Sequence, residues 1–322
     1  MKKHYFTGLI LSMLFCLMVF IPFCHVSAEA TTEATTTETS KTVKVPNGLV
    51  KENGKYHYYK NGKLVKKQWK TIKKAKYYFD KNGDAVVGSY EIKDVYYVFQ
   101  SNGKLFCPKK PRLTQVGEKY LLADEEGKAV KGWNIVDGKL YCMNRKGVCQ
   151  TDKKIDGIQL SKKGVAKKSN RTKLKMKVIQ IVDSITTDDM TKSQKLRACW
   201  NYMVSRSRFR YSSAKYPKLN KSGWYRDTAY DMLTTRRGNC YSFACAFAAL
   251  ADQVGYDCKV ICGRVSGSRD HASDGLTRHS WVQIGGRNYD PEGQFAGWKR
   301  GVYGLRRYTV RHTIQRRVAF QY

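Results

Sequence analysis

The stretch Arg236-Arg237-Gly238-Asn239-Cys240-Tyr241-Ser242-Phe243-Ala244 decides how the second half of this chain folds. Glycine and asparagine before the cysteine are typical of a turn. After it, apolar residues recur at helical spacing until Gly255, at Phe243, Phe247, Leu250, Ala251 and Val254. Cys240 is therefore predicted at the first turn of a buried helix. There the free backbone N–H groups and the helix dipole favour a thiolate.

A nucleophilic thiolate needs a base, and the base needs an orienting partner. Residues 278–284 alternate polar and apolar and predict a half-buried strand that carries His279. Asp290 follows eleven residues later, in a second strand that returns after a glycine pair at 285–286. Paired strands would let Asp290 hold one imidazole nitrogen while the other faces the thiol. His271 is the rival base, but its loop-like surroundings favour His279.

The order Cys, His, Asp on helix, strand and strand resembles the transglutaminase-like superfamily of papain-type thiol enzymes, over about residues 229–294. The resemblance implies an α+β transglutaminase-like (papain-like cysteine protease) fold. It also implies that Cys240 is the nucleophile, His279 the base and Asp290 the orienter, with the backbone N–H of Cys240 as one oxyanion donor. From periodicity we expect helices near 174–185, 191–203 and 227–234 before the cysteine helix, and strands near 258–265, 279–284, 287–290 and 308–314.

Plainer interpretations of these residues stay open at this point. Cys240 can be a buried core thiol, because cysteine is often buried. His279 can be a strand histidine that faces solvent. Asp290 can simply begin the Asp-Pro turn. Trp281 is expected in the core of the sheet rather than in the chemistry.

The first 28 residues have the parts of a secretory signal peptide: Lys2 and Lys3, an apolar run to Phe23 and a small-residue site at 26–28. An uncleaved membrane anchor is the alternative. Residues 29–45 form a Thr/Glu-rich linker. The net charge of +34 predicts an anionic neighbour. An envelope polyanion fits an exported protein better than nucleic acid, for which the sequence has no binding motif; a well-solvated basic surface is the alternative.

Residues 46–166 repeat an aromatic strand followed by a glycine turn, with turn glycines 21, 20, 24, 20 and 17 residues apart. A single hairpin cannot bury its aromatic face, so we expect an all-β hairpin-repeat solenoid. The region resembles the choline- or glucan-binding cell-wall repeats of Gram-positive surface proteins, but tyrosine replaces most of the tryptophan that cages choline. Choline binding is therefore disfavoured, and sugar or wall-polymer binding stays open beside a purely structural role. The candidate ligand-contacting residues are Trp69, Trp133, Tyr59, Tyr78 and Tyr97.

Eight cysteines follow the predicted signal peptide. Cys142 and Cys149 flank a short turn and could bridge a hairpin. Cys258 and Cys262 share one face of a strand at a separation too large for a disulfide. No Cys-x-x-Cys pair, histidine cluster or glycine-rich phosphate loop indicates a metal or another cofactor, and none is expected.

Together these features predict a secreted, cell-wall-associated thiol acyl-transfer enzyme with its catalytic domain at residues 170–322. Its partners would be a protein or peptide substrate and, through the repeats, a wall polymer. Hydrolysis as a peptidase or amidase is favoured, since bacterial members of the family that it resembles are often proteolytic. A protein-crosslinking transglutaminase is one alternative. A non-catalytic wall-binding surface protein is the other.

Overall fold

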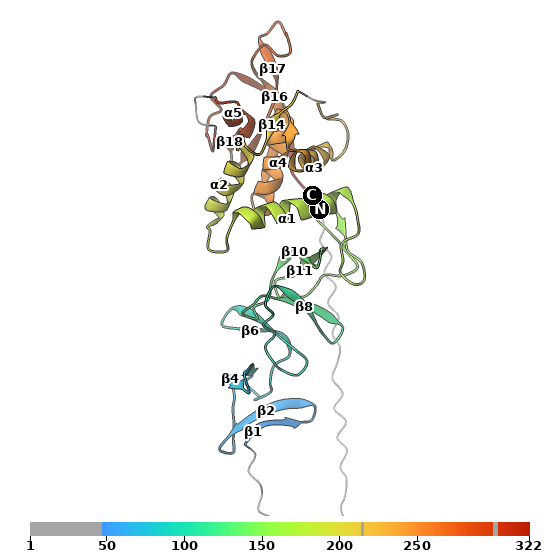
Figure 1. The fold of residues 1–322 in the computed structure, drawn as a ribbon, viewed down its shortest axis with the longest axis vertical. Helices are drawn as coiled ribbons and strands as arrows, with labels where there is room; N and C mark the ends of the chain where they lie inside the picture. Colours follow the sequence, from blue (N-terminus) through green and yellow to red (C-terminus); the bar gives the residue numbers. More distant parts are fainter. Residues whose placement is uncertain (1–46, 214–215, 299–301) are drawn as a thin grey trace, which may run out of the picture. The chain divides into compact units, whose positions relative to one another are not determined.

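The computed structural model describes residues 47–213, 216–298 and 302–322 (Figure 1). The predicted signal peptide at 1–28 and the linker at 29–45 lie outside these residues. Within the described part of the chain, no helix is long and apolar enough to cross a membrane.

The first part of the described chain consists of antiparallel β-hairpins, which confirms the predicted repeat architecture. Several hairpin turns place two successive residues at positive φ, as at Asn53 and Gly54 with φ of 49° and 80°, which matches the twist of the flanking strands. The strands are β1 Gly48–Glu52, β2 Lys55–Lys60, β3 Lys63–Leu64, β4 Gln68–Ile72, β5 Ala75–Phe79, β6 Gly88–Ile92, β7 Val95–Phe99, β8 Arg112–Val116, β9 Lys119–Ala123, β10 Gly132–Val136, β11 Lys139–Met143, β12 Lys154–Ile155 and β13 Ile158–Gln159.

The glycine turns that define the repeat come after the aromatic strands, as predicted, but in most repeats the segment after the turn is not a full strand. They follow the second strand and lead into segments that make isolated bridges, such as Phe79 with Ala85. The turn inside the β4–β5 hairpin is Lys73-Lys74, with both residues at positive φ. Lysine has no intrinsic preference for positive φ, so a lysine pair is not a recognised turn signal. Here the pairing of β4 with β5 imposes the turn.

Consecutive repeats are joined through their backbones. From the second glycine turn onward, an amide after the turn donates to a carbonyl of the repeat before it, as in Leu105 to Lys76 at 2.8 Å and Ala129 to Tyr96 at 2.8 Å. The contact is close, since a Cβ added at Gly127 would lie 2.7 Å from Leu105 Cγ. Each repeat thus completes the core of its neighbour, as expected for units that cannot bury an apolar face alone.

The second part is α+β, as predicted. A four-stranded antiparallel sheet has the order β18-β17-β16-β19. Its strands are β16 Cys258–Ser266, β17 Leu276–Ile284, β18 Arg287–Tyr289 and β19 His312–Ala319. A short parallel pair joins β14 Arg210–Tyr211 to β15 Arg237–Gly238. The helices are α1 Asn170–Ile185, α2 Lys192–Met203, α3 Trp224–Thr235, α4 Cys240–Gln253 and α5 Pro291–Phe295.

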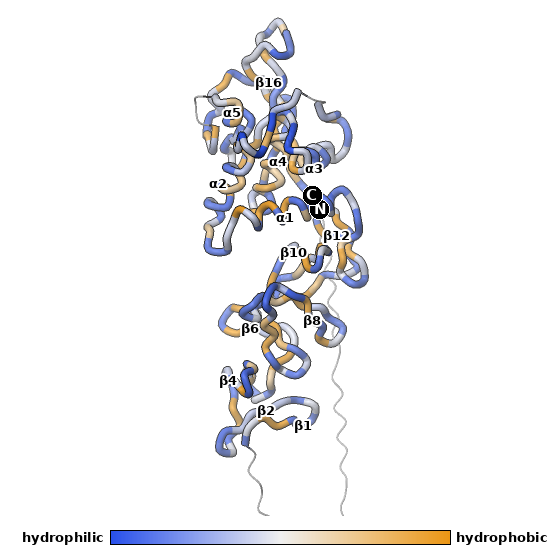
Figure 2. Tube along the Cα trace, in the orientation of Figure 1, coloured by the Kyte–Doolittle hydropathy of each residue, from blue (hydrophilic) through white to orange (hydrophobic). Residues whose placement is uncertain are grey.

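Helix α4 lies at the centre of the core, and all its side chains from Cys240 to Ala251 are buried except Ser242. Its apolar residues lie in one cluster with those of α1, α2, α3 and the sheet (Figure 2). Because α4 contacts several elements, its N-terminus has little freedom to move.

Three expectations need correction. The strand predicted near 308–314 begins at His312 and runs to Ala319. Asp290 does not belong to a strand but caps α5, because its side chain binds the first turn of that helix. Cys142 and Cys149 are free thiols rather than a disulfide, since they are buried in separate clusters.

Candidate active site

Cys240 is the first residue of α4, where the sequence places it. The side chain of Asn239 caps the helix by accepting from the Tyr241 amide at 3.1 Å. Gly238 packs closely behind, and a Cβ there would lie 2.3 Å from the Ser242 Cβ. Gly238 also pairs with Tyr211 across the β14–β15 ladder. These contacts fix a fully buried thiol at a helix N-terminus, where the dipole favours negative charge.

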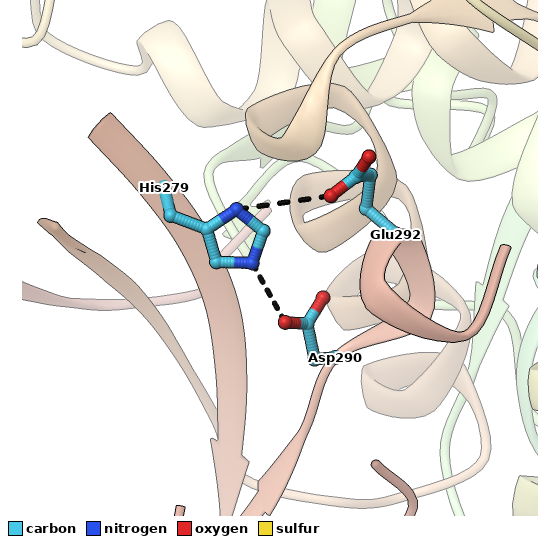
Figure 3. Close-up of side chains that lie close together, drawn as sticks. All are labelled: His279, Asp290 and Glu292. Carbon is cyan, nitrogen blue, oxygen red and sulfur yellow. Dashed lines mark hydrogen bonds and ion pairs between the residues drawn. The ribbon is translucent and has the colours of Figure 1, made fainter. Parts of the chain in front are cut away.

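The structure brings His279 and Asp290 together. His279 lies on β17 opposite Gly263 of β16, and Asp290 directly follows β18 after the hairpin at 285–286. The His279 Nε2 atom lies 2.6 Å from Asp290 Oδ2 (Figure 3). Both side chains are buried, so this contact is shielded from water and salt.

Cys240 joins the pair from α4, and its side chain interacts with that of His279. Since Nε2 is engaged by Asp290, the nitrogen left for the thiol is Nδ1. Burial lowers the pKa of His279, but the charge and hydrogen bond of Asp290 and the interaction with Cys240 raise it more, to well above its ordinary value. The site therefore favours a charged imidazolium beside the sulfur.

Asp290 is held in place by three hydrogen bonds. Its Oδ2 atom accepts from the Tyr308 hydroxyl as well as facing His279, and its Oδ1 atom accepts from the Gly293 amide at 2.8 Å. Burial raises the pKa of Asp290, but His279, Tyr308 and the Gly293 amide together lower it below its ordinary value. Asp290 can therefore cap α5 and orient His279 at the same time, because it uses Oδ1 for the cap and Oδ2 for the imidazole.

Aromatic rings enclose the imidazole. Trp298 stacks on His279 with ring centroids 5.4 Å apart, and Trp281 lies at 6.3 Å. Trp281 is fully buried, stacks on Tyr308 at 4.6 Å and donates to the Asn288 side chain at 3.1 Å. Trp281 is therefore part of the sheet core, as the sequence suggests, and the rings shield the polar network from water.

Glu292 is a member of the site that sequence reasoning missed. Its Oε2 atom lies 3.8 Å from His279 Nδ1, the nitrogen that faces the thiol (Figure 3). Burial raises the pKa of Glu292, although the charge of His279 opposes this effect. Nothing in the Asp-Pro-Glu sequence marks this glutamate, which enters the site because α5 turns at Asp290.

His279, Asp290 and Glu292 offer ligand atoms within 4.8 Å of one another, as a metal centre would require. However, Asp290 already accepts three hydrogen bonds, and both nitrogens of His279 have partners. A carboxylate and an imidazole arranged in this way fit an acid–base network better than a set of metal ligands.

Three of the five repeat residues that the sequence singles out lie together. Trp69 is 38% exposed, and its ring contacts those of Tyr78 and Tyr97 at 5.4 Å and 5.2 Å. Trp69 and Tyr97 line a cavity of about 740 Å³. The other two lie elsewhere: Tyr59 donates to Glu52 at 3.2 Å, and Trp133 donates to an aspartate at 2.8 Å.

In a comparison with known proteins, the family model of the transglutaminase-like superfamily matches residues 179–295 of this chain. This match confirms the resemblance predicted from the Cys, His and Asp motifs. No curated protein matches the chain.

Among solved structures, choline binding protein F from Streptococcus pneumoniae, determined in the presence of a peptidoglycan analogue, is 25% identical. The match covers 38% of this chain and 40% of that one, with a TM-score of 0.29. The modular autolysin LytC from Streptococcus pneumoniae is 18% identical over 38% of this chain and 28% of its own, with a TM-score of 0.28. The chain thus spans well under half the length of either protein.

Proposed function

We propose that this chain is a secreted, cell-wall-associated thiol acyl-transfer enzyme that uses Cys240, His279 and Asp290 to hydrolyse peptide or amide bonds. The observation that carries the proposal is the buried contact of His279 with Asp290, 2.6 Å between Nε2 and Oδ2, beside a Cys240 side chain that raises the pKa of His279. The superfamily matched by residues 179–295 contains cysteine peptidases and acyltransferases. The helix start, strand and capped turn supply the nucleophile, base and orienter that such chemistry needs.

In the first half of the reaction, the Cys240 sulfur attacks the carbonyl carbon of the substrate and forms a tetrahedral intermediate. The backbone N–H of Cys240 is suited to stabilise the oxyanion. The His279 imidazolium then gives its proton to the departing amine, which leaves a thioester on the sulfur. Asp290 keeps the ring oriented and stabilises its charge throughout.

In the second half, neutral His279 removes a proton from water, which attacks the thioester carbonyl. The carboxylic acid leaves and the thiol is regenerated, so that no proton is gained or lost by the enzyme overall. A lysine amine in place of the water would give an isopeptide crosslink. Glu292 is the observation that favours this alternative, because its carboxyl group lies 3.8 Å from the Nδ1 atom that would take the proton of an incoming amine.

The regions outside the catalytic domain would place the enzyme at the cell wall. Residues 1–28 would direct export, residues 29–45 would be a spacer, and residues 46–166 would hold the catalytic domain at residues 170–322 on the wall. The exposed Trp69 beside Tyr97 offers a stacking surface for a wall glycan. The net charge of +34 suits an anionic envelope. A non-catalytic wall protein would need the repeats but not the Cys–His–Asp network.

The test is incubation of purified protein with wall peptides and with a glutamine-bearing protein, each with and without a primary amine, followed by mass spectrometry. Cleavage or deamidation supports hydrolysis, and amine incorporation supports crosslinking. The matched control is Cys240→Ala, which should lose every product. If the wild type and this variant give the same products, the non-catalytic alternative is correct.

A second measurement needs no known substrate. Iodoacetamide should modify Cys240 at neutral pH faster than an ordinary thiol, and His279→Gln should remove this advantage. Modification of Cys240 that is no faster than that of free cysteine would contradict the proposed chemistry.

A further inference from the structure

We infer that Arg269 forms an anion subsite beside Cys240 that selects acyl donors carrying a carboxylate next to the bond under attack. The inference rests on the proposed function, because the subsite is defined relative to the nucleophile. It names the substrate class that the Cys240, His279 and Asp290 network cannot define by itself.

The position of Arg269 follows from two contacts. Its guanidinium lies over the ring of Tyr211, 5.4 Å from the centroid. Tyr211 is the register partner of Gly238, two residues before the nucleophile. Arg269 therefore stands over the strand pair that leads directly into Cys240.

The loop that carries Arg269 is also tied to the base. Asp270 accepts from the Arg278 amide at 2.7 Å and from the Arg278 guanidinium at 3.0 Å. Arg278 immediately precedes His279 on β17. The loop is thus anchored next to His279, while Arg269 lies against the strand pair that precedes Cys240.

The charge of Arg269 is available to a ligand. Neighbouring arginines are neutralised, Arg278 by Asp270 and Arg264 by Asp274. Among the described residues, no carboxylate lies within ion-pair distance of Arg269, whose side chain is exposed. It instead lies over the Tyr211 ring and interacts with Tyr216.

The charge of Arg269 also acts on the groups around the nucleophile. Electrostatic interactions connect Arg269 with Cys240 and with Glu292. A purely structural role, in which Arg269 compensates the buried Glu292, would call for an ion pair between them. The two groups lie beyond ion-pair distance, so Glu292 leaves the guanidinium free to bind.

A guanidinium held by aromatic rings suits a planar carboxylate, which it can bind through two parallel hydrogen bonds. The expected substrate is a peptide whose free α-carboxylate or acidic side chain is adjacent to the scissile amide. A neutral amide at that position would lose these bonds. A phosphate-bearing wall polymer is the competing source of negative charge.

The test compares two alkylating reagents of similar size, anionic iodoacetate and neutral iodoacetamide, on the full chain. The rate for each is measured by mass spectrometry on the peptide containing Cys240, which excludes the exposed Cys107. Arg269→Gln should lower the iodoacetate-to-iodoacetamide rate ratio about tenfold, because only the anion loses its countercharge. Arg269→Lys should keep most of the ratio. Arg264→Gln removes one charge at a paired site and should leave the ratio unchanged.

An unchanged ratio in Arg269→Gln, or an equal fall with both reagents, would overturn the inference. This outcome is distinct from failure of the proposed function, which would appear as a wild-type iodoacetamide rate that does not depend on His279. Protection of Cys240 from iodoacetamide by N-acetylalanine, but not by N-acetylalaninamide or inorganic phosphate, would support a carboxylate. Stronger protection by phosphate than by N-acetylalanine would refute it.

Discussion

The replacement Asp290→Asn tests the centre of the site. It keeps the size of a fully buried side chain and removes its negative charge. The carboxylate accepts from Gly293 and Tyr308 and lies 2.6 Å from His279 Nε2. An amide in its place removes the nearer of the two carboxyl groups beside the buried imidazolium, so the neutral ring becomes more favoured.

The expected loss of reactivity follows from these contacts. A hydrogen bond to a charged group contributes about 1.5–3 kcal/mol, which corresponds to roughly 10- to 100-fold in a rate. The alkylation of Cys240 by iodoacetamide at neutral pH should fall by this factor. The peptidase or crosslinking rate should fall at least as much, because the imidazolium must also deliver a proton.

The same contacts fix the pH dependence of folding. The lowered pKa of Asp290 contributes stability that is present above its ordinary value of 3.8 and is lost as the pH falls through the folded value. The raised pKa of His279 contributes stability that is fully present below its ordinary value of 6.5 and is lost as the pH rises through the folded value. The difference in unfolding free energy between wild type and variant should therefore be largest between these two values.

Urea unfolding at pH 5 and pH 9 measures this difference, and alkylation at pH 7 measures reactivity. Tyr308→Phe is the matched control, because it removes one hydrogen bond to Asp290 and keeps the charge. It should lower the unfolding free energy by about 1.5–3 kcal/mol. Two outcomes would refute the reasoning: an Asp290→Asn protein that alkylates at the wild-type rate, or a stability difference that is the same at both pH values.

Three further predictions concern other parts of the chain. Gly238→Ala should lower the unfolding free energy by about 1–3 kcal/mol in thermal unfolding, since its Cβ would lie 2.3 Å from that of Ser242. A variant that melts at the wild-type temperature would contradict this close packing. Trp69→Ala should weaken binding to purified cell walls about tenfold in a sedimentation assay, because Trp69 is exposed among neighbouring rings. Trp133→Phe should not weaken it. An equal loss of wall binding in both variants would argue against a binding role for Trp69. Burial raises the pKa of Cys199 to about 12, so its peptide should remain unalkylated at pH 8 under native conditions, and rapid modification would contradict the helix packing.

The elements that carry the site were predictable because each has a local pattern. The helix that begins at Cys240 follows from a turn signal before 3.6-residue periodicity. The β17–β18 hairpin follows from alternation and the glycine pair at 285–286. The superfamily resemblance rested on these elements in order, and the match over residues 179–295 confirms it.

The sequence was less informative where structure depends on several segments at once. The Lys73-Lys74 turn has no residue preference of its own and is imposed by the pairing of β4 with β5. The last strand was placed too early, because Tyr308 is an aromatic residue of strand-like type that instead packs on Trp281 and donates to Asp290. Propensity predicts what a residue favours locally, whereas these positions are decided by contacts far along the chain.

Glu292 and Arg269 show the same limit at the site itself. Neither lies in a motif, and each enters through a side chain: the Asp290 cap turns α5 so that Glu292 faces His279, and the Asp270–Arg278 contact holds the loop of Arg269 near the base. A charged group beside a nucleophile changes which substrates react without altering the catalytic pattern. In the proposed enzyme, the Cys, His and Asp motifs would specify the bond-breaking chemistry, and the contacts of Glu292 and Arg269 would decide which acceptor and which acyl donor undergo it.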